Sequence, residues 1–91
     1  MGYQWDPAKA SSNLRKHNID FADAMGVFED EWALTLTEDV RNGEPRYVTL
    51  GMDFLSRLLV VVYTFRENDI RLISARPATR KERRTYEQKR I

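Results

Sequence analysis

The chain has 91 residues and a formal net charge of +1, a length that suits one small domain over residues 1–91 and leaves no room for a separate cofactor domain. It has no cysteine, which excludes disulfides, thiolate nucleophiles and cysteine-bound zinc and favours a reducing cytoplasm. The longest apolar run, residues 58–63, is too short to cross a bilayer, and the N-terminal residues lack a signal-type apolar region, so no membrane association is expected.

Two short helices are expected first. Asp6 can cap the first one, and Pro7 suits its first position. One face of that helix then carries residues at positions i, i+3, i+4 and i+7, namely Ala10, Asn13, Leu14 and His17. Asp20 is expected to cap the second helix, which repeats the spacing with Phe21, Ala24, Met25 and Phe28. Both apolar stripes are narrow, so each helix must lie on a larger element.

That element is expected to be a sheet. Four segments are rich in β-branched and aromatic residues, namely 32–37, 46–52, 57–65 and 70–76. Turn-prone stretches at 39–45 and 67–69 separate them, and such short connections favour an antiparallel meander. The run 58–63 does not alternate, as expected of a central strand that is covered on both faces.

The last segment leads from a strand into a helix rich in arginine. Thr79 and Glu82 have capping-box spacing, and Tyr86 is the main apolar anchor of this helix. Residues 66–91 hold nine Lys or Arg against four Asp or Glu, whereas residues 18–44 hold eight carboxylates and only Arg41. Two faces of opposite charge are therefore predicted. The basic face suits a polyanion such as nucleic acid, and the acidic one either keeps the surface soluble or docks a basic partner.

Four motifs together resemble the BrnT family of type II toxins. They are Trp5-Asp6-Pro7-x-Lys9-x-x-x-Asn13-x-x-Lys16-His17, Phe21-x-x-Ala24, Arg57-x-Leu59-Val60-Val61-Val62 and Ile73-Ser74-Ala75-Arg76-x-Ala78-Thr79-x-x-Glu82-Arg83-x-x-Tyr86. The resemblance spans almost the whole chain and departs modestly at Asn18, where the family commonly has Gly. It implies a RelE-like α+β fold of two N-terminal helices, a four-stranded antiparallel sheet and a C-terminal helix. That order agrees with the elements expected above.

The resemblance also implies a function. A BrnT-like protein is expected to be a small RNA-cleaving toxin, held inactive by a cognate BrnA-type antitoxin and reaching operator DNA only through the antitoxin complex. An endoribonuclease acting on RNA is therefore the principal expectation. The alternative is a catalytically silent module that binds nucleic acid or an antitoxin and acts as a transcriptional co-repressor.

The residues themselves suit a metal-independent ribonuclease. Such an enzyme needs a base for the ribose 2′-hydroxyl, cations for the phosphorane and an acid for the leaving 5′-oxygen. The main phosphate-binding set is predicted to be Arg71, Arg76, Arg80 and Arg83, with Arg84 beside them. The predicted proton carrier is His17 or Lys9; histidine is the side chain best suited to proton transfer near neutral pH. Lys16, Glu82 and Tyr86 are further candidates.

Several of these residues have structural alternatives. His17 could orient the turn at Asn18 rather than carry a proton. Trp5 could stack on an RNA base or close the core. Arg76 is expected to contact phosphate rather than form a salt bridge to the acidic half. Tyr86 could anchor the last helix or donate a proton to the leaving group.

No metal or cofactor is expected. One histidine cannot make a histidine-based zinc site of the usual kind, and the four glycines form no phosphate-cradling loop. The serines lie in no nucleophile-elbow context. Enzyme classes that depend on nucleotides or metals are therefore not favoured.

Overall fold

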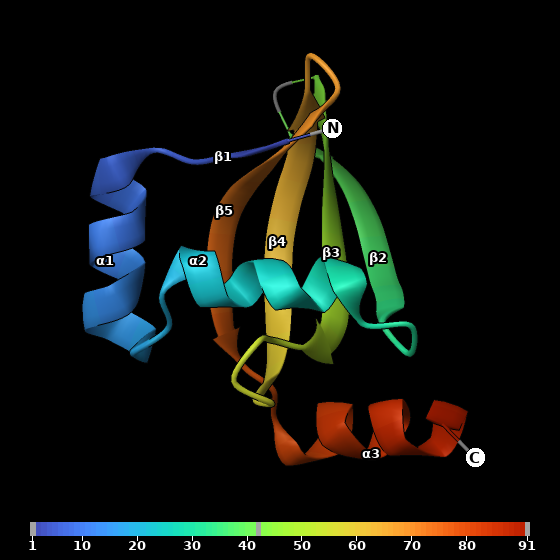
Figure 1. Cartoon of the computed structure of the whole chain (residues 1–91). Helices are drawn as coiled ribbons and strands as arrows, with labels where there is room; N and C mark the ends of the chain where they lie inside the picture. Colours follow the sequence, from blue (N-terminus) through green and yellow to red (C-terminus); the bar gives the residue numbers. More distant parts are fainter. Residues whose placement is uncertain (1, 42, 91) are drawn as a thin grey trace.

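The computed structural model describes residues 2–41 and 43–90, over which the chain forms one mixed sheet flanked by helices (Figure 1). The elements in order are β1 (Tyr3–Gln4), α1 (Pro7–His17), α2 (Phe21–Ala24), the 3-10 helix η1 (Met25–Glu29), β2 (Leu34–Arg41), β3 (Glu44–Met52), β4 (Leu58–Arg66), β5 (Asp69–Pro77) and α3 (Arg80–Arg90). None of the helices in the described part of the chain combines the length and apolarity needed to span a membrane.

The sheet differs from the prediction at one end. Strands β2 to β5 form the expected antiparallel meander, with β4 at the centre of the order β1-β5-β4-β3-β2. The short β1 adds a parallel neighbour to β5, pairing Tyr3 with Ile70 and Gln4 with Arg71. The sheet is thus five-stranded and mixed, and the prediction of a four-stranded antiparallel sheet is wrong. Two residues carry no periodicity, and their partners lie 67 positions away, so no local pattern in the sequence indicates this strand.

The hairpin turns are tighter than expected. β2 continues to Arg41 and β3 begins at Glu44, so the predicted turn over 39–45 shortens, and its residue 42 lies outside the described residues. Between β4 and β5 the turn consists of Glu67 and Asn68, both with positive φ angles of 50° and 74°. Positive φ at both central residues is the geometry that matches the twist of a two-residue hairpin.

The predicted helix caps are confirmed. Asp6 Oδ1 accepts a hydrogen bond from Ala8 N at 2.8 Å, and Asp20 Oδ1 accepts one from Ala22 N at 2.9 Å. Helix α1 ends at Asn18, whose φ of 58° is left-handed.

Beyond Ala24 the second helix departs from the prediction. The α-helical turn tightens into η1, where a Cβ on Gly26 would lie 2.4 Å from Phe54 N. Only glycine lets the backbones approach so closely. Leu14 also departs from its expected place on the buried stripe, since it is 46% exposed.

The core occupies both faces of the sheet. Helix α2 and η1 cross one face, called here the helix-covered face (Figure 1). The buried strand residues of this face are Leu59, Val61, Tyr63, Ile70, Leu72 and Ala75. On the opposite face, Tyr86 of α3 packs with Leu50, Leu58 and Val60. Side chains alternate along a strand, so Arg71, between the buried Ile70 and Leu72, points to this opposite face.

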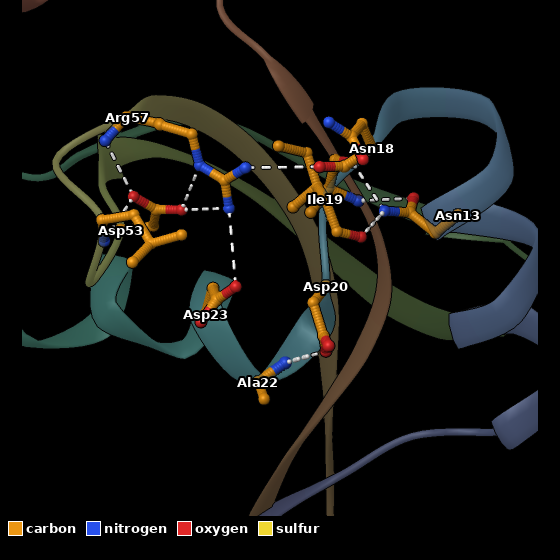
Figure 2. Close-up of polar contacts among 10 residues, drawn as sticks. Asn13, Asn18, Ile19, Asp20, Ala22, Asp23, Asp53 and Arg57 are labelled. Carbon is orange, nitrogen blue, oxygen red and sulfur yellow. Dashed lines mark hydrogen bonds and ion pairs between the residues drawn. The ribbon is translucent and has the colours of Figure 1, made fainter.

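Asn13 joins α1 to β5 with its side-chain amide (Figure 2). The Asn13 Nδ2 donates to Ala75 O at 2.9 Å, and Asn13 Oδ1 accepts from Ala75 N at 3.0 Å. The same Nδ2 also donates to Ile19 O at 3.1 Å, so one buried side chain satisfies three backbone groups. The amide pairs with Ala75 as the backbone of a neighbouring strand would, and it fixes the position of α1.

Arg57 fixes the β3–β4 turn to the loop between α1 and α2 (Figure 2). Its Nε and Nη2 contact Asp53 Oδ2 at 2.9 and 2.8 Å, and its Nη1 donates to Asn18 O at 3.3 Å. Asp53 Oδ1 also accepts from the backbone N–H groups of Leu55 and Arg57. The Arg57 of the third sequence motif thus has a structural role.

Candidate functional site

A first hollow lies where α1 packs beside β5. It has a volume of about 260 Å³ and is lined by Lys9, Ser12, Asn13, Lys16, His17, Ile73 and Ser74. Positions 9, 12, 13 and 16 follow the i, i+3, i+4, i+7 pattern, so they form one stripe of α1. The bonds between Asn13 and Ala75 hold this stripe against β5. The first hollow is therefore built by two rigid elements.

The two predicted proton carriers meet in this hollow. His17, the last residue of α1, is half-buried, and Lys9 is exposed two helical turns earlier. Within residues 2–41 and 43–90 the His17 ring makes no hydrogen bond or ion pair. Over the same ranges, no three His, Asp or Glu side chains gather closely enough to hold a metal ion. The hollow thus offers an imidazole, two ammonium groups and two serine hydroxyls to a ligand.

A second hollow of about 100 Å³ adjoins the first on the sheet. It is lined by Lys9, Glu44, Arg46, Thr64, Arg66, Arg71 and Ile73, so Lys9 and Ile73 belong to both hollows. The three arginines come from three neighbouring strands, and Thr64 pairs with Arg71 in the β4–β5 register. Two of these arginines make long polar contacts. The distance is 3.5 Å from Arg66 Nη2 to Glu44 Oε1 and 3.4 Å from Arg71 Nη1 to Gln4 Oε1.

The sequence interpretation missed part of this constellation. Arg46 and Arg66 were not among its site residues, and neither were the serines Ser12 and Ser74. Period-2 alternation in β3 and β4 could have assigned both arginines to the face that carries Arg71. The meander that pairs β3, β4 and β5 was expected, but the register between these strands, which brings the three side chains together, was not predicted.

Arg76 makes an ion pair that the sequence interpretation did not favour. Its Nη1 and Nη2 contact Glu82 Oε1 and Oε2 at 2.9 and 3.0 Å. The hydrogen bond from Arg76 lowers the pKa of Glu82 to about 2, and the same bond raises the pKa of Arg76. The expected capping box is confirmed, because Glu82 Oε1 accepts from Thr79 N and Thr79 Oγ1 accepts from Glu82 N. Arg76 is thus held at the start of α3.

Two other predicted site residues belong to the core. Tyr86 is 1% exposed, and its hydroxyl donates to Asp30 Oδ2 at 2.7 Å. Trp5 is half-buried and meets the Phe21 ring edge-to-face, with the centroids 5.9 Å apart. Neither residue lines a described hollow. The structural alternative therefore fits both, and their predicted contacts with RNA have no support in the structure.

The remaining predicted arginines lie on α3. Arg80, Arg83 and Arg84 are exposed and line neither hollow. On the helix-covered side, exposed carboxylates lie on or beside α2 and η1, at Asp20, Glu29 and Glu31. The cations of the second hollow lie on the opposite face, but Glu44 of the predicted acidic segment lines the same hollow, so charge among the described residues is separated only in part.

The fold and the two hollows define a small α+β protein with a cationic, ionisable surface. The family described as "Ribonuclease toxin, BrnT, of type II toxin-antitoxin system" matches residues 5–82. The chain therefore belongs to the BrnT family of ribonuclease toxins, which confirms the resemblance seen in its motifs.

A solved structure has the same fold. The ribonuclease toxin BrnT of Brucella abortus superposes with a TM-score of 0.64, at 22% sequence identity, over 88% of this chain and 99% of that chain. The comparison with curated proteins gave no match.

Proposed function

We propose that this protein is an endoribonuclease of the mRNA-interferase type, which cleaves RNA without a metal ion through attack of the ribose 2′-hydroxyl on the adjacent phosphate. The observation that carries the proposal is the junction of the two hollows at Lys9 and Ile73. The first hollow supplies groups that move protons, and the second supplies guanidinium groups for phosphate oxygens.

The residues of the first hollow have distinct roles in this proposal. His17 takes the 2′-hydroxyl proton, since its half-buried ring makes no hydrogen bond within the described residues. Lys9 lies between the two hollows and stabilises the charge that develops on the phosphorane. Lys16, the second ammonium group of the first hollow, donates the proton that the leaving 5′-oxygen needs. The expected products carry 2′,3′-cyclic phosphate and 5′-hydroxyl ends.

A labelled RNA incubated with the protein in EDTA tests this function. Wild type is expected to cut it, and His17→Ala and Lys9→Ala are each expected to lose about 100-fold or more in rate. Arg15→Ala is the matched control, because Arg15 is an exposed cation of α1 outside both hollows. Loss of cleavage in EDTA with recovery in Mg²⁺ would refute the metal-independent mechanism. Binding of RNA without any cleavage would support the co-repressor alternative.

We also propose that a BrnA-type antitoxin silences the protein by laying carboxylates over its cationic surface. Family membership and the exposed Arg80, Arg83 and Arg84 of α3 support this proposal. Association between opposite charges is expected to slow as salt rises. Calorimetry compares wild type with an Arg80→Glu, Arg83→Glu variant, which is expected to bind the antitoxin more weakly. Unchanged affinity would place the inhibitory contact elsewhere on the protein.

A further inference from the structure

The second hollow holds more positive charge than its own residues neutralise. Among the described residues, its lining holds four cations, Lys9, Arg46, Arg66 and Arg71, and one carboxylate, Glu44. The contacts of Arg66 with Glu44 and of Arg71 with Gln4 are 3.5 and 3.4 Å long, at the outer limit of a hydrogen bond. Like charges gathered in one small space repel each other, so an anion bound among them would be strongly favoured.

Arg46 provides a second, independent sign of a missing ligand. Its Nε is buried and has no hydrogen-bond partner among the described residues. A buried donor without an acceptor costs about 1–3 kcal/mol, and a charged donor costs more. An oxygen acceptor within reach of this N–H would remove that cost.

The chemistry of the lining selects a phosphate group. Planar guanidinium forks bind phosphate oxygens well, and the three forks come from adjacent strands about 4.8 Å apart. Thr64 already donates its hydroxyl to Pro45 O at 2.6 Å, and Ile73 is apolar. The lining of the second hollow thus has few free polar groups that could recognise the edge of a base, so the contact would be independent of RNA sequence.

We propose that the second hollow is a phosphate subsite, which holds a backbone phosphate of the RNA next to the one that is cleaved. This inference rests on the proposed function, since the first hollow is taken as the place of cleavage. Ser74 of the first hollow and Arg71 of the second lie three residues apart on β5, and Lys9 and Ile73 line both hollows, so the two sites adjoin. The positioning residues are Arg46, Arg66 and Arg71. Their binding to a phosphate that does not react helps to align the scissile bond.

Binding of an uncleavable RNA tests the subsite separately from catalysis. The probe is a short single-stranded 2′-O-methyl oligonucleotide, measured by fluorescence anisotropy over a series of salt concentrations. The Arg46→Gln, Arg66→Gln variant is expected to bind more weakly and to lower the salt slope by about 0.7 for the lost phosphate contact. Arg15→Gln is expected to keep the wild-type slope. An unchanged slope in the double variant would overturn the proposal.

A single neutral linkage locates the subsite. Replacing one phosphodiester of the probe by an uncharged methylphosphonate, moved along the strand, is expected to weaken wild-type binding at one linkage above the rest. The double variant is expected to be indifferent to that linkage, whereas equal sensitivity in both proteins would refute the assignment. Inorganic phosphate that binds as tightly as the oligonucleotide would indicate a site for the free anion and would also overturn it.

Substitution of the half-buried Arg46 can disturb folding, so the single variant Arg66→Gln is measured as well. The Arg66 side chain is 51% exposed, and its loss is expected to leave the fold intact. Loss of the neutral-linkage effect in this single variant supports the proposal, and its persistence contradicts it. Oligonucleotide binding that depends on Arg66, in a protein that cuts no RNA, would uphold the subsite and refute the proposed ribonuclease function.

Discussion

Arg76 and Glu82 join the end of β5 to the first turn of α3 through two parallel contacts of 2.9 and 3.0 Å. Glu82 Oε1 also accepts the Thr79 N–H at 2.8 Å, so one carboxylate serves an ion pair and a helix cap at once. This double use fixes the direction in which α3 leaves the sheet. It also makes the contribution of the pair separable, because glutamine can replace glutamate in a capping box.

Glu82→Gln is expected to lower stability at neutral pH by about 0.5–1 kcal/mol, a modest loss because the pair is partly exposed to solvent. The pKa of Glu82 is lowered from 4.5 to about 2, so the pair stabilises fully above pH 4.5 and loses its effect as the pH falls towards 2. Urea unfolding of both proteins across that range measures the difference between them. A difference that does not shrink in acid would show that the charge of Glu82 is not its cause.

Asn13→Ala is expected to reduce the free energy of unfolding by roughly 2–4 kcal/mol, because it leaves the Ala75 amide, the Ala75 carbonyl and the Ile19 carbonyl without their buried partner. Ser11→Ala, an exposed change on the same helix, serves as the control. Urea titration of the two variants checks the result. Similar small losses in both would mean that water replaces the amide at little cost.

Arg57→Ala is expected to cost about 2–3 kcal/mol, because the Asp53 carboxylate is fully buried and would lose its charged partner. Asp53 keeps its two backbone donors, which limits the loss. Asp23→Ala is a useful comparison, since its contact with Arg57 is 3.7 Å long and partly exposed. That change is expected to cost less than about 0.5 kcal/mol. Thermal unfolding ranks the two variants, and the reverse order would contradict this account of the turn.

Tyr86→Phe separates the two roles considered for this residue. Loss of the hydrogen bond to Asp30 is expected to cost about 1–2 kcal/mol, while the rate of RNA cleavage per folded molecule stays within about threefold of wild type. Cleavage is compared at a temperature where both proteins are folded. A drop of about 100-fold or more would restore Tyr86 as the proton donor to the leaving group.

Local signals in the sequence were reliable guides to the fold. The caps at Asp6 and Asp20 and the box of Thr79 with Glu82 bind backbone groups two or three residues away, so spacing alone predicts them. The contact of Asn13 with Ala75 spans 62 positions and leaves no such pattern. The parallel β1 was missed for the same reason. Tertiary pairing, rather than local propensity, decides both features.

The candidate site shows the same division. Lys9 and His17 belong to one helix and both line the first hollow, but the expected helical stripe with His17 did not include Lys9. The prediction of the arginine set rests on the density of charge along the chain, which does not say which way a side chain faces. Strand register instead groups Arg71 with Arg46 and Arg66, and the capping box brings Arg76 to Glu82.

The amide of Asn13 has a consequence for how the molecule meets others of its kind. A strand at the border of a sheet invites an extended segment from another chain to pair with it, which is a route to aggregation. The edge of β5 that faces away from β4 is already occupied. There β1 pairs with Ile70 and Arg71, and the Asn13 amide bonds to the backbone of Ala75. The sheet therefore presents β2 to any incoming strand, and growth by strand addition would proceed from that side.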